Sequence, residues 1–136
     1  MKRTVCITVA VLITIAASFG QAAEKIDTIL ETEKTTFGQA AYLIQTALND
    51  GSDELDFNTA FNRFKSENQN VIPDSVTAED VIPAKTYAFL LMKAFNIKGG
   101  IMYRIYPCPR YAYRDLRYLA VIQDKNTPNA PMTGTA

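Results

Sequence analysis

The sequence of 136 residues contains no histidine, no tryptophan and only two cysteines. Histidine is the commonest general base and a frequent zinc ligand, so its absence excludes Ser-His and Cys-His catalytic dyads. Cys6 lies in the N-terminal apolar run, and removal of that run leaves Cys108 without an intramolecular disulfide partner. A phosphate-binding loop is also missing, because Gly99-Gly100 is not followed by Lys-Ser or Lys-Thr. We therefore expect no catalytic centre, no metal site and no cofactor.

The N-terminus has the three parts of a secretory signal peptide. Two basic residues precede an apolar run over residues 5–19, and small residues follow at Ala22 and Ala23. The run is shorter than the ~20 apolar residues that a membrane-spanning helix needs. The sequence predicts a signal peptide over residues 1–22 and an exported protein of the periplasm or cell envelope, with no stable membrane span after cleavage. An uncleaved N-terminal anchor is the alternative.

Charge is distributed unevenly along the mature chain. Its 12 basic and 14 acidic side chains nearly balance, which does not suit a nucleic-acid-binding protein. Residues 24–96 carry a net charge of −6, whereas residues 97–136 carry +4. The two parts can attract each other within the fold, or the basic part can meet an anionic partner.

The spacing of apolar residues predicts about four amphipathic helices and therefore a mainly α-helical fold. The first helix is expected to begin at a capping box formed by Thr36 and Gln39, the second at Asp56, and the third near Pro83. The fourth is expected to run from about residue 110 to 122. The expected buried stripes of the third and fourth helices are Ala84, Ala88, Leu91, Phe95, Ala112, Leu116, Leu119 and Ala120.

The remaining stretches are expected to be less regular. Gly99-Gly100 should end the third helix, and the β-branched and aromatic residues at 101–106 predict at most a short strand pair or an extended loop. Residues 23–35 are polar and are expected to form a flexible segment that leads into the domain. Residues 125–136 contain two prolines and several turn-forming residues, which predicts an irregular C-terminal tail. The remaining residues, 36–124, are predicted to form a single helical domain.

Paired carboxylates are the remaining route to catalysis, as in glycoside hydrolases. Asp53, Glu54, Asp56, Glu79 and Asp80 lie near predicted loops or helix starts. Carboxylates favour these places because they accept from free N–H groups and face the positive end of the helix dipole. We interpret them as caps. A carboxylate-based glycan hydrolase or another small periplasmic enzyme is the alternative to a binding protein.

Tyrosines and arginines are concentrated between residues 103 and 118. Arginine stacks on aromatic rings and binds anionic oxygens through paired hydrogen bonds, and aromatic faces stack on sugar rings. The pattern predicts a binding face for an envelope protein or an anionic cell-wall glycan. Alternatively, the tyrosines pack against the third helix and the arginines pair with the acidic part of the chain. The candidate residues are Tyr103, Arg104, Tyr106, Arg110, Tyr111, Tyr113, Arg114, Arg117 and Tyr118.

The order of helices and loops resembles the S-layer homology (SLH) domain, with its helix-loop-helix pairs. Residues 111–119 are similar to the first helix of that module, and residues 128–133 are similar to the loop before its second helix. An earlier copy covers residues 57–95, in which Ile82-Pro83-Ala84-Lys85-Thr86-Tyr87-Ala88 stands at the Ile-Thr-Arg-Ala-Glu-Phe-Ala motif. The polysaccharide-binding arginine of that motif is not matched in either copy. The resemblance implies a non-enzymatic envelope protein with a role in binding or assembly.

Overall fold

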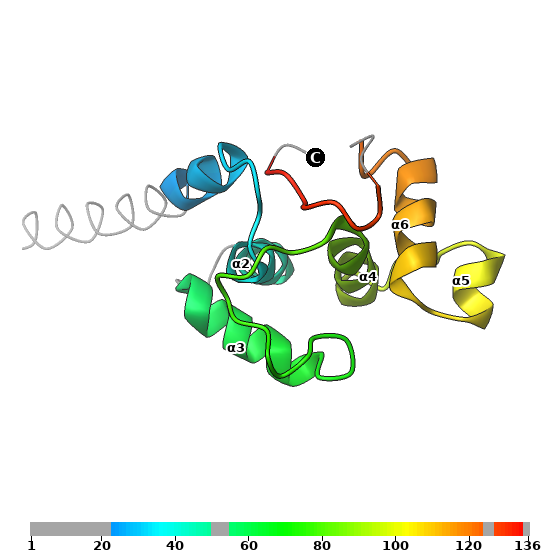
Figure 1. Ribbon diagram of the computed structural model, residues 1–136, viewed down its shortest axis with the longest axis horizontal. Helices are drawn as coiled ribbons and strands as arrows, with labels where there is room; N and C mark the ends of the chain where they lie inside the picture. Colours follow the sequence, from blue (N-terminus) through cyan, green and yellow to red (C-terminus); the bar gives the residue numbers. More distant parts are fainter. Residues whose placement is uncertain (1–22, 50–54, 124–126, 135–136) are drawn as a thin grey trace, which may run out of the picture.

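The computed structural model describes residues 23–49, 55–123 and 127–134, and it is mainly helical, as predicted. The predicted signal peptide over residues 1–22 lies outside the described residues. Within the described ranges there are two isolated β-bridges and no named strand, and no helix has the length and apolarity that a membrane crossing requires. The helices labelled in Figure 1 are α2 (Phe37–Leu48), α3 (Phe57–Glu67), α4 (Ala84–Ala94), α5 (Ile101–Ile105) and α6 (Pro109–Tyr118).

Local hydrogen bonds determine where the predicted helices begin. Thr36 Oγ1 accepts from the Gln39 N–H at 3.3 Å, and Gln39 Oε1 accepts from the Thr36 N–H at 3.0 Å, which completes the capping box of α2. Asp56 Oδ2 accepts from the Asn58 N–H at 3.3 Å at the start of α3. Pro83 is the N-cap of α4, where its missing N–H removes no helical hydrogen bond. All three predicted starts are confirmed.

The ends of α4 and α6 come earlier than predicted, because residues other than glycine take the left-handed conformation. After α6, Ala120 has a φ of 56°, and the Val121 N–H donates back to Leu116 O at 3.0 Å. This is a Schellman motif, which glycine normally favours. α4 ends in the same way at Asn96, with a φ of 50°. The sequence predicted instead that Gly99-Gly100 would end this helix, but both glycines lie outside α4.

The prediction of a short strand pair at residues 101–106 is wrong, because Ile101–Ile105 form α5. Strand propensity depends on a neighbouring strand to pack against, and the described residues provide none here. The Arg104 N–H instead closes a helical hydrogen bond to Gly100 O at 3.0 Å. Asp115 Oδ2 of α6 accepts from the Gly100 N–H at 2.8 Å, which ties the start of α5 to α6.

Residues 23–30 form a helix, which corrects the expectation of a flexible segment over residues 23–35. Ile29 is 1% exposed and belongs to the hydrophobic core, and Ile26 packs against that core. The two isoleucines lie on one helical face, and this short pattern was hidden by the polar composition around it. Gly134 approaches this helix closely, since a Cβ at that position would collide with the Ile29 carbonyl.

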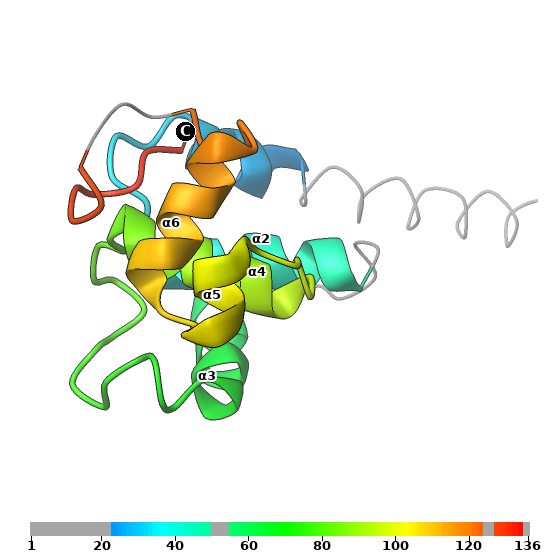
Figure 2. The ribbon, with the colours of Figure 1, turned by 90° about the vertical axis from the view of Figure 1, so that its right-hand side faces the viewer.

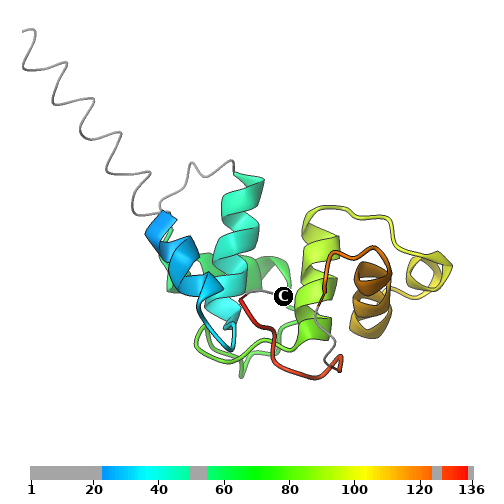
Figure 3. The same cartoon turned by 90° about the horizontal axis from the view of Figure 1, so that it is seen from above.

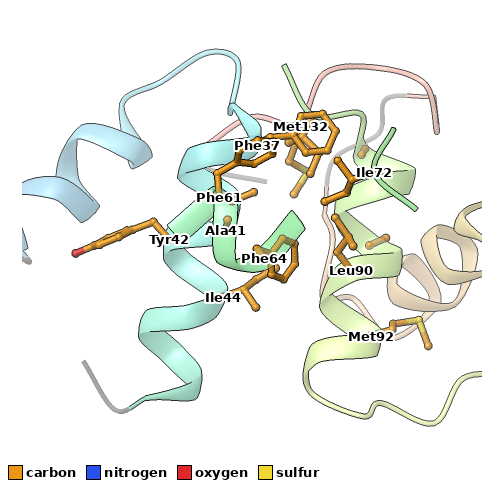
Figure 4. Packing of buried hydrophobic residues seen from close by; sticks show 14 of the residues in the cluster. Phe37, Ala41, Tyr42, Ile44, Phe61, Phe64, Ile72, Leu90, Met92 and Met132 are labelled. Carbon is orange, nitrogen blue, oxygen red and sulfur yellow. The ribbon is translucent and has the colours of Figure 1, made fainter. Parts of the chain in front are cut away.

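The core is built from helix pairs that meet at α2 and α4. α2 packs against α3, α4 packs against α6, and α2 and α4 are in contact; Figure 3 shows the α2–α3 and α4–α6 sides of the molecule from above. Phe37 of α2 and Phe61 of α3 meet edge to face with ring centroids 6.3 Å apart. Figure 4 shows part of this packing. The largest fully buried side chains are Ile29, Ile44, Ile72, Ile82, Leu90, Met92 and Leu116.

The predicted stripe of α4 is only partly correct. Ala84 and Ala88 are fully buried, and the small side chains allow close packing against neighbouring elements. Leu91 is only half-buried, and Phe95 is 40% exposed because it is the C-cap residue beyond the helix. Leu90 is 1% exposed instead. α4 contacts both α2 and α6, so its buried arc is wider than a single stripe.

The predicted stripe of α6 is likewise correct only near its centre. Ala112 and Leu116 are fully buried where α6 packs against α4. Leu119 is 53% exposed, and Ala120 is also exposed. Both residues follow the last residue of α6, so the helical spacing that would have brought them to the core no longer applies.

Two loops, residues 77–80 and 127–130, have the same pattern of backbone hydrogen bonds, and each caps a helix. Each loop precedes a buried residue, Ile82 or Met132, and each supplies two carbonyls to the N-terminus of a helix. These carbonyls accept N–H groups that have no partner within the helix itself. The hydrogen bonds are Phe37 N–H to Asp80 O (2.9 Å) and Gly38 N–H to Ala78 O (2.8 Å) at α2, and Ala84 N–H to Ala130 O and Lys85 N–H to Pro128 O (both 3.0 Å) at α4.

Three backbone hydrogen bonds form a closed ring in the core. The Ile82 N–H donates to Thr35 O at 3.0 Å, the Met132 N–H to Ile82 O at 3.0 Å, and the Thr35 N–H to Met132 O at 2.7 Å. All three residues are at least 96% buried. We call this the three-residue ring. It joins the segment before α2, the segment before α4 and the irregular segment 127–134, so Met132 of that segment is part of the core.

Candidate binding face

α6 carries arginine and tyrosine side chains around an open hollow of about 790 Å³. Arg110, Arg114 and Arg117 are three or four residues apart, which places them on one side of α6, opposite the buried Ala112 and Leu116. Six of the nine candidate residues line the hollow, together with a proline from the C-terminal segment. The lining residues are Arg110, Tyr111, Tyr113, Arg114, Arg117, Tyr118 and Pro128.

Two of the arginines lie over tyrosine rings. Arg114 Cζ is 5.1 Å from the centroid of the Tyr111 ring, and Arg117 Cζ is 5.8 Å from that of Tyr113. Tyr113 is only 3% exposed, so its ring is part of the core and supports Arg117 from below. Stacking restrains a guanidinium plane while its N–H edge stays available to an anionic oxygen.

The charge on this face is only slightly compensated. Arg114 Nε lies 4.0 Å from Asp115 Oδ1, and the two side chains are 61% and 13% exposed. Within the part of the chain that the structure describes, no carboxylate forms an ion pair with Arg110 or Arg117. Among the described residues, these two arginines thus do not pair with the acidic part of the chain. The three arginines give the lining of the hollow an excess of positive charge.

The other three candidate residues lie on or beside α5, outside the hollow. Tyr103 packs edge-on against Phe89 of α4, with ring centroids 6.1 Å apart. Burial raises the pKa of Tyr103, and the nearby Asp115 and Cys108 raise it further. Arg104 is exposed, and Tyr106 is 69% exposed. The structure thus divides the predicted face into an α6 group and an α5 group, with Tyr103 as a packing residue.

Asp115 is a positioning residue that the sequence reasoning did not single out. It is the only acidic residue between residues 97 and 123. Its two carboxylate oxygens face different elements, Oδ1 toward Arg114 and Oδ2 toward the Gly100 N–H. A lone carboxylate within a basic stretch is the sequence signal that could have identified it, since such a group is expected to have a specific partner.

Cys108 and Asp80, two other side chains with reactive groups, lie at a helix cap and in a hydrogen-bonded turn. Cys108 is a partly exposed free thiol at the N-cap of α6. Asp80 Oδ2 accepts from the Thr77 N–H at 2.7 Å and from Thr77 Oγ1 at 3.0 Å, and these hydrogen bonds lower the pKa of Asp80. Asp53 and Glu54 lie outside the described residues. Among the residues that are described, no group of three or more Cys, Asp or Glu side chains could hold a metal ion.

Searches against protein-family models, curated proteins and solved structures found no match to this chain. The role of the face must therefore be inferred from its own geometry and charge.

Proposed function

We propose that this chain is an exported, non-enzymatic protein of the cell envelope, and that it acts in binding or assembly through the hollow on α6. The observation that carries the proposal is the group of three arginines, two of them stacked on tyrosine rings, around an open surface. Guanidinium groups bind carboxylate and phosphate oxygens through paired hydrogen bonds. Tyr118 is 90% exposed and offers an aromatic face to a sugar ring. An anionic cell-wall glycan fits this chemistry, and an acidic envelope protein is the other candidate partner.

The two equivalent loops support a repeated architecture. Residues 77–80 and 127–130 both follow a helix and a buried isoleucine, and both cap a helix N-terminus. These loops belong to the two stretches whose sequences resemble the S-layer homology domain. We therefore propose that the chain contains a degenerate helical repeat of that kind, without the arginine that binds polysaccharide in the family.

Replacing both Arg114 and Arg117 with alanine should weaken binding to purified anionic cell-wall glycan by about tenfold or more, because each charge-assisted hydrogen bond contributes roughly 1.5–3 kcal/mol. Titration calorimetry with the full chain measures this change. Binding by the unaltered chain should also weaken when the salt concentration rises from 0.15 to 1 M, since the screening length falls from about 8 to 3 Å.

The matched control is Arg63→Ala, an exposed arginine on α3 far from the hollow in sequence. This variant should bind like the unaltered chain. If the double variant loses thermal stability and keeps full binding, the arginines are structural and the binding face is disproved. Release of soluble fragments from envelope peptidoglycan by the unaltered chain would instead identify a hydrolase.

The proposed export is tested separately from binding. Protein recovered from its native compartment should have the intact mass of a chain that begins after residue 22 or 23, because the apolar run is followed by small residues typical of a cleavage site. A mass that still includes residues 1–22 would show that the N-terminus is an uncleaved anchor.

A further inference from the structure

α5 and its flanking residues form a second exposed surface with a different character from the hollow on α6. Figures 1 and 2 show α5 beyond α6, at the outer end of the molecule. Four large apolar or aromatic side chains there are at least half exposed, which is unusual for neighbouring residues in a folded domain. We call them the α5 tip: Ile101 (74% exposed), Met102 (51%), Ile105 (74%) and Tyr106 (69%).

The fold holds the tip in its outward orientation. Tyr103 points inward and packs against Phe89 of α4, so the opposite side of α5 faces away from the protein. Ile101 and Ile105 are one helical turn apart on that opposite side. The Gly100 N–H is bound by Asp115 Oδ2, which attaches the start of α5 to α6. The isoleucines are therefore exposed because of how α5 is packed.

The charge around the tip indicates what covers it. Residues 97–114 contain no acidic side chain, whereas Lys98, Arg104 and Arg110 lie close to the tip in sequence and are all exposed. Exposed apolar side chains flanked in the sequence by basic ones are typical of proteins that lie on anionic bilayers. Arginine and lysine can keep their charges at headgroup level while their stems lie deeper, and tyrosine suits the same layer.

We propose that the α5 tip inserts into the headgroup layer of a lipid bilayer that carries anionic lipids. A tip one helical turn wide enters such a layer without a complementary pocket, whereas a folded protein partner would need one. The basic side chains would lie at the level of the lipid phosphates. Arg110 also lines the hollow on α6, but the four tip residues, Lys98 and Arg104 do not. The inference therefore goes beyond the proposed function, and it is tested at Ile101 and Ile105, which lie outside the hollow.

The absence of tryptophan provides a site-specific test in the full chain. Ile105→Trp places a single fluorophore on the tip, and Leu48→Trp places one at the end of α2, where Leu48 is 49% exposed. Each variant is mixed with vesicles of phosphatidylcholine alone or with added phosphatidylglycerol. The tryptophan at position 105 should shift its emission to shorter wavelength and lose intensity to brominated lipid, in the anionic vesicles only. The tryptophan at position 48 should show neither effect.

Each other outcome overturns the proposal. Equal shifts at positions 105 and 48 would mean general adsorption, for example through the N-terminal apolar run. A shift at position 105 without vesicles, growing with protein concentration, would mean that a second copy covers the tip. An equal shift in both vesicle types would show that the basic residues do not contribute to membrane binding. As an internal check, adding Ile101→Ser to the Ile105→Trp variant should weaken vesicle binding by about tenfold, while the circular dichroism stays unchanged.

Discussion

Replacing Leu116 with alanine is expected to lower the free energy of unfolding by about 2–5 kcal/mol. Leu116 is fully buried between α6 and α4, so the change removes apolar contacts and leaves a cavity that the two helices cannot fill completely. A domain of this size has a total stability of about 5–15 kcal/mol, and each kcal/mol changes its melting temperature by roughly 4–8 °C. Thermal unfolding followed by circular dichroism should therefore show a decrease of about 10 °C or more.

Leu119→Ala is the matched control, because it removes the same atoms from a side chain three residues further along that is 53% exposed. Its effect should be small, within about 0.5 kcal/mol. Equal losses for the two variants would show that the buried side of α6 has been assigned incorrectly.

The largest expected effect comes from the C-terminal segment. Truncation after Pro131 removes two of the three hydrogen bonds of the ring, and it leaves the buried Thr35 N–H without its acceptor. A buried polar group left unsatisfied costs about 1–3 kcal/mol, and the lost burial of Met132 adds about 2–5 kcal/mol. Most of the stability of the domain should be lost. Urea denaturation followed by circular dichroism measures the difference.

Two controls distinguish the effect of losing the three-residue ring from the effect of shortening the chain. Truncation after Gly134 keeps all three ring residues and should leave the urea midpoint almost unchanged. Met132→Ala keeps the backbone bonds and loses the side chain, so it should have an intermediate effect, whereas Met102→Ala, at a 51% exposed position, should have little. If truncation after Pro131 is harmless, the ring contributes nothing to stability.

The parts of the fold that depend on local interactions were predictable from the sequence. The Thr36–Gln39 capping box, the Asp56 cap and the Pro83 start each involve residues within a few positions of one another, so short patterns identify them. The arginine side of α6 was predictable for the same reason, because helical spacing alone brings Arg110, Arg114 and Arg117 together.

Features that depend on distant partners were not predictable. α5 consists of residues typical of strands, and it is attached by a carboxylate of α6 and by packing on α4. Met132 lies in a segment rich in proline and threonine, and its burial depends on Thr35 and Ile82, far away in sequence. Likewise, Ala120 ends α6 although alanine normally prolongs a helix. Tertiary contacts override local preference at α5 and at Met132, whereas α6 ends through the local hydrogen bond from the Val121 N–H to Leu116 O.

The three-residue ring also has a consequence for the order of folding. In a chain that emerges N-terminus first, whether from a ribosome or from a translocation channel, Thr35 appears long before Met132. The Thr35 N–H finds its acceptor only after Met132 has emerged, since the ring joins residues that lie far apart in the sequence. Contacts of such long sequence separation close late and slowly, because the entropy of loop closure must be overcome first. The hydrogen-bonded core can therefore be completed only after Met132 has emerged.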